Sequence, residues 1–168
     1  MKQEVQKAIN DQIRAEFQSA YAYLAMSARM DEMRLPGMAA WLKLQWEEEI
    51  AHAMKFYEFM LQRDARVDLL QLNAPDADFS TALECFELVL SHEQKITAKI
   101  NKLYQLAVAE GDYPLQTLLQ WFIDEQVEEE ENARNAIDAL TLVGDSGPGL
   151  FMLDRELGAR KPEAEAAE

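Results

Sequence analysis

Four glutamates fall at the middle of four stretches whose other repeating positions are apolar and helically spaced. They are Glu16, Glu49, Glu93 and Glu129, and His52 follows Glu49 at i+3. A buried carboxylate is costly unless it pairs with a cation or binds a metal. Such residues at one level of a helical bundle therefore indicate a metal site.

Ordinary ion pairing is the main alternative explanation for these acidic residues. A single Glu on an apolar stripe is more often a boundary residue or half of an ion pair, and the ExxH match at 49–52 is weak by itself. The central positions of the four stretches, however, contain no Lys or Arg. Crowded carboxylates would repel one another, and several would stay protonated without a counter-charge. The coincidence on four helices therefore predicts a dinuclear metal site.

The ligand types indicate which metal such a site would bind. Carboxylates with one imidazole and no thiolate favour iron or manganese over a structural zinc site. Glu combined with a Glu-x-x-His pair in a four-helix core is the di-iron or di-manganese carboxylate arrangement. Oxygen ligands of this kind stabilise Fe(III) over Fe(II), so we expect a site at which O₂ readily oxidises Fe(II).

The elements that must position these residues are long helices. Ala, Leu, Glu, Gln and Met are abundant, and only six Gly and five Pro occur, a mixture that favours helix. Ser80 with Glu84 nearby resembles a helix start. The breaks in the pattern predict four helices and a short apolar segment, at about residues 4–33, 37–64, 80–110, 114–143 and 150–157.

Connection lengths predict the topology. The link between the first and second helices is short, and so is the link between the third and fourth helices. These short links predict two antiparallel hairpins. The connection at 65–78 is long enough to run the length of the bundle, which makes the second and third helices parallel. The predicted fold class is all-α, a ferritin-like four-helix bundle with one long crossover connection and a short fifth C-terminal helix. We expect one domain over 1–158 and a disordered tail over 159–168.

Composition excludes several classes of function. The net charge of −15 argues against a nucleic-acid or anionic-membrane partner. Cys85 is the sole cysteine, so no intrachain disulfide or CxxC metal knuckle can form. The opening sequence MKQEVQKAIN lacks the apolar stretch of a signal peptide, and no apolar run approaches membrane-spanning length. We therefore expect a cytoplasmic protein.

Across residues 3–158 the chain resembles the prokaryotic non-haem ferritins. The motifs that carry the resemblance are Glu16 with Tyr23, Glu48-Glu49-x-x-His52, Glu93-Gln94 and Trp121-x4-Gln126-x2-Glu129. Their combination is specific, although no single motif is.

The resemblance implies a ligand for each iron of a ferroxidase centre. Glu16, Glu49 and His52 would bind the first iron. Glu49 would bridge to the second iron, which Glu93 and Glu129 would complete. The cofactor implied is therefore a di-iron centre within one subunit.

The resemblance also implies supporting residues and an activity. Gln126 resembles the glutamine that lines the centre, and Tyr23 resembles the nearby tyrosine that can donate an electron. Members of the family oxidise Fe(II) with O₂ or H₂O₂ and store Fe(III) as a mineral. They do so inside a homo-oligomeric cage of 24 subunits, whose four-fold axes are lined by the fifth helices.

A third iron site is implied beside the first two. Its residues would be Glu48, Glu125 and Glu128, with Glu129 shared. The alternative is that 124–131 is a solvated acidic face, as runs of charge usually are. Like charges at i+3 and i+4 slightly disfavour a helix, which makes a binding role for them the stronger interpretation.

Departures from related families narrow the prediction. Bacterioferritins carry a second ExxH on the fourth helix, where this chain has Gln126 and Glu129 without a His. Their haem-binding Met directly follows the second-helix Glu, and here that residue is Ile50. No haem is therefore expected. We expect His92 to point away from the centre.

Three other interpretations compete with an iron-storage ferroxidase. A di-iron peroxide reductase of the rubrerythrin type usually adds a Cys-rich module and a further ExxH, and this chain has neither. A plain helical bundle or a catalytically silent cage subunit would bind no metal, against the complete ligand set. A miniferritin is disfavoured because its irons lie between subunits.

Overall fold

The structure, a computed structural model, describes residues 1–75 and 77–161. The helices in this part of the chain are α1 (Gln3–Glu32), α2 (Pro36–Gln62), α3 (Ala82–Ala109), α4 (Tyr113–Val143) and α5 (Gly147–Leu157). These described ranges contain no strand. The all-α prediction is confirmed, and each long helix begins and ends within a few residues of its predicted bounds.

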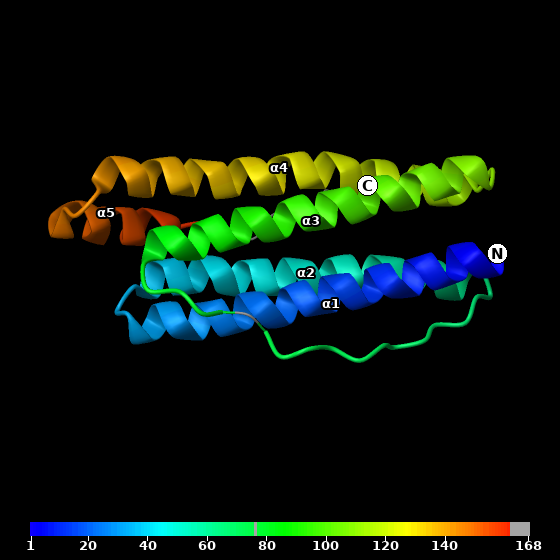
Figure 1. Cartoon of the computed structure of the whole chain (residues 1–168), viewed down its shortest axis with the longest axis horizontal. Helices are drawn as coiled ribbons and strands as arrows, with labels where there is room; N and C mark the ends of the chain where they lie inside the picture. Colours follow the sequence, from blue (N-terminus) through cyan, green and yellow to red (C-terminus); the bar gives the residue numbers. More distant parts are fainter. Residues whose placement is uncertain (76, 162–168) are drawn as a thin grey trace.

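The four long helices form two antiparallel hairpins, α1 with α2 and α3 with α4 (Figure 1). The crossover runs along the whole bundle, from the end of α2 back to the start of α3, so these two helices are parallel. Asn10 holds the crossover against α1, because its side chain donates to the Arg66 carbonyl at 3.2 Å and accepts from the Asp68 N–H at 3.0 Å. The predicted topology with one long crossover is confirmed.

Two helix starts differ from the sequence prediction. Thr81, rather than Ser80, is the N-cap of α3: its hydroxyl accepts from the Glu84 N–H at 3.1 Å, and the Glu84 carboxylate accepts from the Thr81 N–H at 3.2 Å. This reciprocal capping box satisfies two backbone donors. At α5 the Ser146 hydroxyl accepts from the Gly149 N–H at 3.2 Å. The Gly-Pro-Gly stretch is therefore the first turn of α5, which begins three residues before its predicted start at 150.

The apolar core lies in two clusters separated by a belt of buried polar side chains. One cluster packs around Met30, Leu42 and Phe86, and the other packs around Ile9 and Phe56. Each fully buried side chain of this size contributes roughly 1.5–3 kcal/mol. Packing on both sides therefore holds the helices together where the belt itself supplies little apolar contact.

The fifth helix is fixed against the start of α2 by Asp154. Its buried carboxylate accepts the N–H groups of Gly37 at 3.1 Å and Met38 at 2.9 Å, an arrangement that the dipole at a helix N-terminus favours. The backbones approach closely here. A Cβ on Gly37 would lie 1.7 Å from the Asp154 carbonyl oxygen, and one on Gly158 would lie 2.7 Å from the Gly37 Cα.

Backbone hydrogen bonds continue beyond the end of α5. The N–H groups of Ala159 and Arg160 donate to the carbonyls of Glu156 and Leu157 at 3.0 and 3.2 Å. Most of the tail that we expected to be disordered, 162–168, lies outside the described residues, and the domain boundary at 158 stays a prediction. No described helix is both long and apolar enough to cross a membrane.

Candidate metal centre

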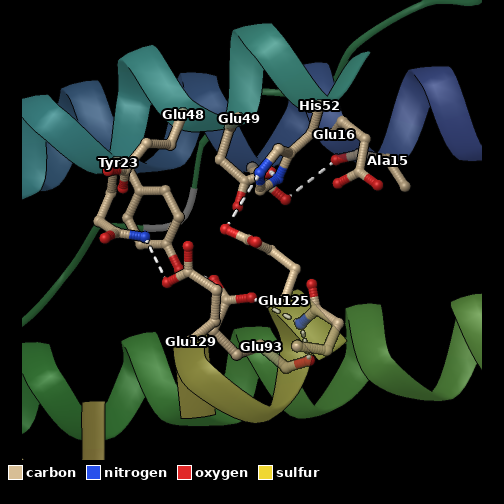
Figure 2. Close-up of polar contacts among 12 residues, drawn as sticks. Ala15, Glu16, Tyr23, Glu48, Glu49, His52, Glu93, Glu125 and Glu129 are labelled. Atoms are coloured by element: carbon tan, nitrogen blue, oxygen red, sulfur yellow. Dashed lines mark hydrogen bonds and ion pairs between the residues drawn. The ribbon is translucent and has the colours of Figure 1, made fainter. Parts of the chain in front are cut away.

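Three predicted ligands converge between α1 and α2. Glu16 comes from α1, while Glu49 and His52 come from α2, and one ligand atom from each lies within 4.8 Å of the other two (Figure 2). All three are buried, with 1%, 1% and 4% of their surfaces exposed. The i+3 spacing brings Glu49 and His52 to the same face of α2. The trio has the donor atoms and the spacing for one metal ion.

Glu93 of α3 and Glu129 of α4 face this trio from the opposite pair of helices (Figure 2). The Tyr23 hydroxyl donates to Glu93, and the Gln126 amide donates to the other Glu93 oxygen at 3.0 Å. The Gln45 amide donates to Glu129 at 2.7 Å. These contacts come from neutral donors, so they orient the carboxylates without neutralising their charge.

Two carboxylate oxygens of the trio are buried without a hydrogen-bond partner. They are one Oε2 on Glu16 and one on Glu49, whereas the other Glu16 oxygen accepts from the Gln12 amide at 2.8 Å. A buried acceptor without a partner usually costs about 1–3 kcal/mol, and more when it is charged. A divalent cation between the two would satisfy both. The residues present therefore fit iron bound by carboxylates and one imidazole.

Burial raises the pKa of the four central carboxyl groups, those of Glu16, Glu49, Glu93 and Glu129. For Glu49, burial is the largest cause, and the neighbouring carboxylates of Glu93 and Glu16 raise the pKa further. The metal-free centre therefore holds protons that exposed carboxylates would lose. Because metal binding needs deprotonated ligands, a metal that binds here releases these protons.

His52 lies between two carboxylates. Its Nδ1 is 3.9 Å from Glu49, and its Nε2 is 3.7 Å from Glu125. Burial lowers the pKa of His52, but Glu125 and Glu16 raise it, and the net shift is upward. The ring also packs edge-on against Trp121, with centroids 5.4 Å apart. A carboxylate on the Nε2 side favours a proton there and leaves Nδ1 free to bind a metal.

The residues predicted for a third site are less closely gathered. Glu125 reaches His52, whereas Glu48 forms an ion pair with Arg160 at 3.0 Å and Glu128 is exposed on α4. Among the described residues only Glu16, Glu49 and His52 form a compact metal-ligating group. The third site therefore stays a prediction.

Sequence reasoning missed several residues that support the centre. Gln45 lies one turn before Glu49, and Gln12 lies one turn before Glu16, so i−4 spacing from a predicted ligand could have identified both. The contact of Arg160 with Glu48 could not be predicted in this way, because Arg160 is distant from α2 in the sequence.

His92 contacts Ser19 and Tyr23. Its Nε2 lies 2.6 Å from the Ser19 hydroxyl, and its ring packs edge-on against Tyr23 with centroids 5.7 Å apart. Burial, with Lys95 and Lys99 nearby, lowers the pKa of His92 to about 4. The ring is therefore neutral and helps to hold Tyr23 in position.

Comparison with known proteins identifies relatives over nearly the whole chain. Residues 6–143 match the family model of the ferritin-like domain. The bacterial non-heme ferritin of Staphylococcus aureus is 39% identical over 154 residues, which cover 92% of this chain and 93% of that protein. A probable bacterial non-heme ferritin-like protein of Haemophilus influenzae is 34% identical over 158 residues, which cover 94% and 96%.

Solved structures agree with these sequence relatives. An open-pore ferritin from the hyperthermophilic archaeon Archaeoglobus fulgidus superimposes with a TM-score of 0.94 at 38% identity, covering 96% of this chain and 99% of that one. The candidate ligands, from Glu16 to Glu129, all lie within residues 6–143, which the family model matches. The resemblance seen in the motifs is therefore confirmed, and the chain belongs to the ferritin family.

Proposed function

We propose that this protein stores iron and is a ferroxidase, which oxidises Fe(II) and keeps Fe(III) as a mineral inside a cage of its own copies. The observation that carries the proposal is the trio of Glu16, Glu49 and His52 with its two buried oxygens that lack partners. Membership of the ferritin family supports the same role.

Each ligand has a proposed role. Glu16 and His52 would bind one iron, Glu93 and Glu129 would bind the other, and Glu49 would be shared between the two, as the family resemblance implies. Each Fe(II) loses one electron, and O₂ or H₂O₂ accepts the electrons. Anionic oxygen ligands favour this step because they stabilise the higher charge of Fe(III).

Gln126 and Tyr23 act through Glu93. Both donate hydrogen bonds to its carboxylate and so fix its direction toward the centre. Burial, together with the charge of Glu93, raises the pKa of Tyr23 well above its usual value, so the phenol keeps its proton. The hydrogen bond to Glu93 would hold the Tyr23 side chain beside the centre, where the family resemblance implies that it can donate an electron.

Assembly of copies is proposed from the apolar surface at one end of the bundle. Three large apolar side chains are mostly exposed: Leu142 at the end of α4, and Phe151 and Met152 on α5. Side chains of this size are usually covered by another chain when they cluster. We propose that the copies form a 24-subunit cage in the cytoplasm without haem, as the family resemblance implies.

Substitution of single ligands tests the proposed activity. Glu49→Ala or His52→Ala should lower the rate of fast Fe(II) oxidation more than about 100-fold, because each removes a direct ligand. Mixing anaerobic Fe(II)-loaded protein with O₂ and following the Fe(III) absorbance measures the rate. Circular dichroism checks that each variant is folded.

Glu47→Ala is the matched control, because Glu47 is an exposed carboxylate on the same helix. It should oxidise iron at the wild-type rate. A wild-type rate in Glu49→Ala or His52→Ala would show that the activity does not use this centre.

A further inference from the structure

Arg160, in the segment that follows α5, contacts residues beside the candidate metal ligands. The Arg160 guanidinium hydrogen-bonds both oxygens of Glu48, at 3.0 and 3.2 Å, and the side-chain oxygen of Gln45. It also lies over the Trp41 ring, 5.0 Å from its centroid. The side chains of Arg160 and Glu48 are only 17% and 15% exposed. This ion pair is therefore far less screened by water than a surface pair.

Gln45 connects this arginine to the centre. Its oxygen accepts from Arg160, and its amide N–H donates to Glu129 at 2.7 Å. Within the described residues, Arg160 is the one Lys or Arg that forms an ion pair with a predicted metal ligand. Arg160 thus places a positive charge beside the candidate ligand carboxylates, which have no other Lys or Arg as an ion-pair partner in the part of the chain that the structure describes.

The position of Arg160 is built into the fold. Asp154 fixes α5 to the first turn of α2, and Gly158 packs directly on Gly37. Two residues later the chain reaches Arg160, whose guanidinium rests on Trp41, a side chain of the core. The arginine is therefore placed by an anchored helix.

We propose that Arg160 competes with metal ions for Glu48 and so weakens the third metal site, of which Glu48 and Glu129 are part. The inference rests on the proposed function. One guanidinium nitrogen, Nη2, lies within hydrogen-bond distance of both Glu48 oxygens, and such charge-assisted contacts are stronger than neutral ones. A metal that binds Glu48 must therefore compete with a cation that already contacts both of its oxygens. Arg keeps its charge at any pH at which proteins function, so the competition is permanent. An ion at this site is then held loosely and passed on readily.

Metal binding without any redox step tests the competition. The metal-free full-length protein is titrated with Co(II) by calorimetry, in the wild type and in Arg160→Gln. We expect two tight sites per chain in both proteins and a third site that becomes at least about tenfold tighter in Arg160→Gln, since its competitor is gone. Lys161→Gln removes the same charge from the next, exposed residue and should behave as the wild type.

A double variant identifies the ligand. Glu48→Gln in the Arg160→Gln background should abolish the gained affinity, and a gain that persisted would overturn the inference. If the wild type has two tight sites but Arg160→Gln binds the third ion as the wild type does, the arginine only anchors the tail, and the inference fails while the proposed function stands. If the wild type lacks the two tight sites, the proposed function itself fails.

Discussion

At the scale of single residues, Glu49 shows why this centre calls for a metal. It is buried, one of its oxygens has no partner, and the carboxylates of Glu16 and Glu93 face it. Two side-chain amides at the centre donate to other carboxylates: Gln12 bonds Glu16, and Gln126 bonds Glu93. Without a bound cation, repulsion among these carboxylates is reduced when some of them are protonated or when His52 carries a positive charge.

This protonation predicts an unusual pH dependence for the metal-free protein. The carboxyl pKa of Glu129 is raised well above its ordinary value of 4.5, first by burial and then by Glu93. The folded state therefore binds more protons than the unfolded state, and its stability falls as pH rises above about 4.5. We expect the Tm of metal-free protein to decrease from mildly acidic to neutral pH.

Thermal unfolding at several pH values, with and without Zn(II), checks this expectation. Glu129→Gln keeps the shape of the side chain without its charge, so its Tm should depend less on pH. Bound Zn(II) should raise the Tm most at neutral pH, because removing the protons from the ligands costs less free energy there than at acidic pH. A metal-free Tm that rose with pH over this range would contradict the raised pKa values.

At the scale of elements, helical periodicity accounts for what was predictable. Residues three or four apart share a helix face, so the spacing of Glu49 and His52 predicts that both side chains face the same part of the bundle. Helix starts were less predictable, because Ser80 and Thr81 are both capable caps. The choice depends on which of them lies three residues before Glu84, the position that closes a capping box.

The docking of α5 on α2 predicts a strong effect of a single methyl group. Gly37→Ala would place its Cβ 1.7 Å from the Asp154 carbonyl oxygen, so α5 must shift or the carboxylate cap must break. We expect a loss of about 1–3 kcal/mol in the free energy of unfolding, measured in urea. Amide hydrogen exchange in α5 should increase as well.

Gly147→Ala serves as the matched control, because a Cβ there meets nothing within 4 Å. It should leave the stability unchanged within about 0.5 kcal/mol. Equal behaviour of the two variants would mean that the contact between α5 and α2 does not constrain the fold.

At the scale of the whole molecule, we expect metal binding and assembly of copies to be separable. The trio and the two carboxylates opposite come from helices of one chain. The exposed apolar residues Phe151 and Met152, in contrast, belong to α5, which lies at one end of the bundle (Figure 1). Loss of assembly should therefore leave the centre able to bind metal.

A charge on α5 tests this separation. Phe151→Glu should reduce the assembled mass measured by light scattering, because burying a carboxylate between copies is unfavourable. Its two tight Co(II) sites per chain should remain. Val127→Glu, a change at an exposed position in the middle of α4, is the control and should assemble normally. An unchanged mass for Phe151→Glu would exclude α5 from the contacts between copies.

The sequence by itself determined the helical class, the crossover topology and the four buried glutamates, because local spacing and connection length follow from the geometry of a helix. Only the tertiary structure decided which side chains meet across helices. Tyr23 bonds Glu93 from 70 residues away, and Arg160 reaches Glu48 from 112 residues away. Such contacts depend on the rotation and axial register of packed helices, which the distant core contacts and the Asp154 cap set together.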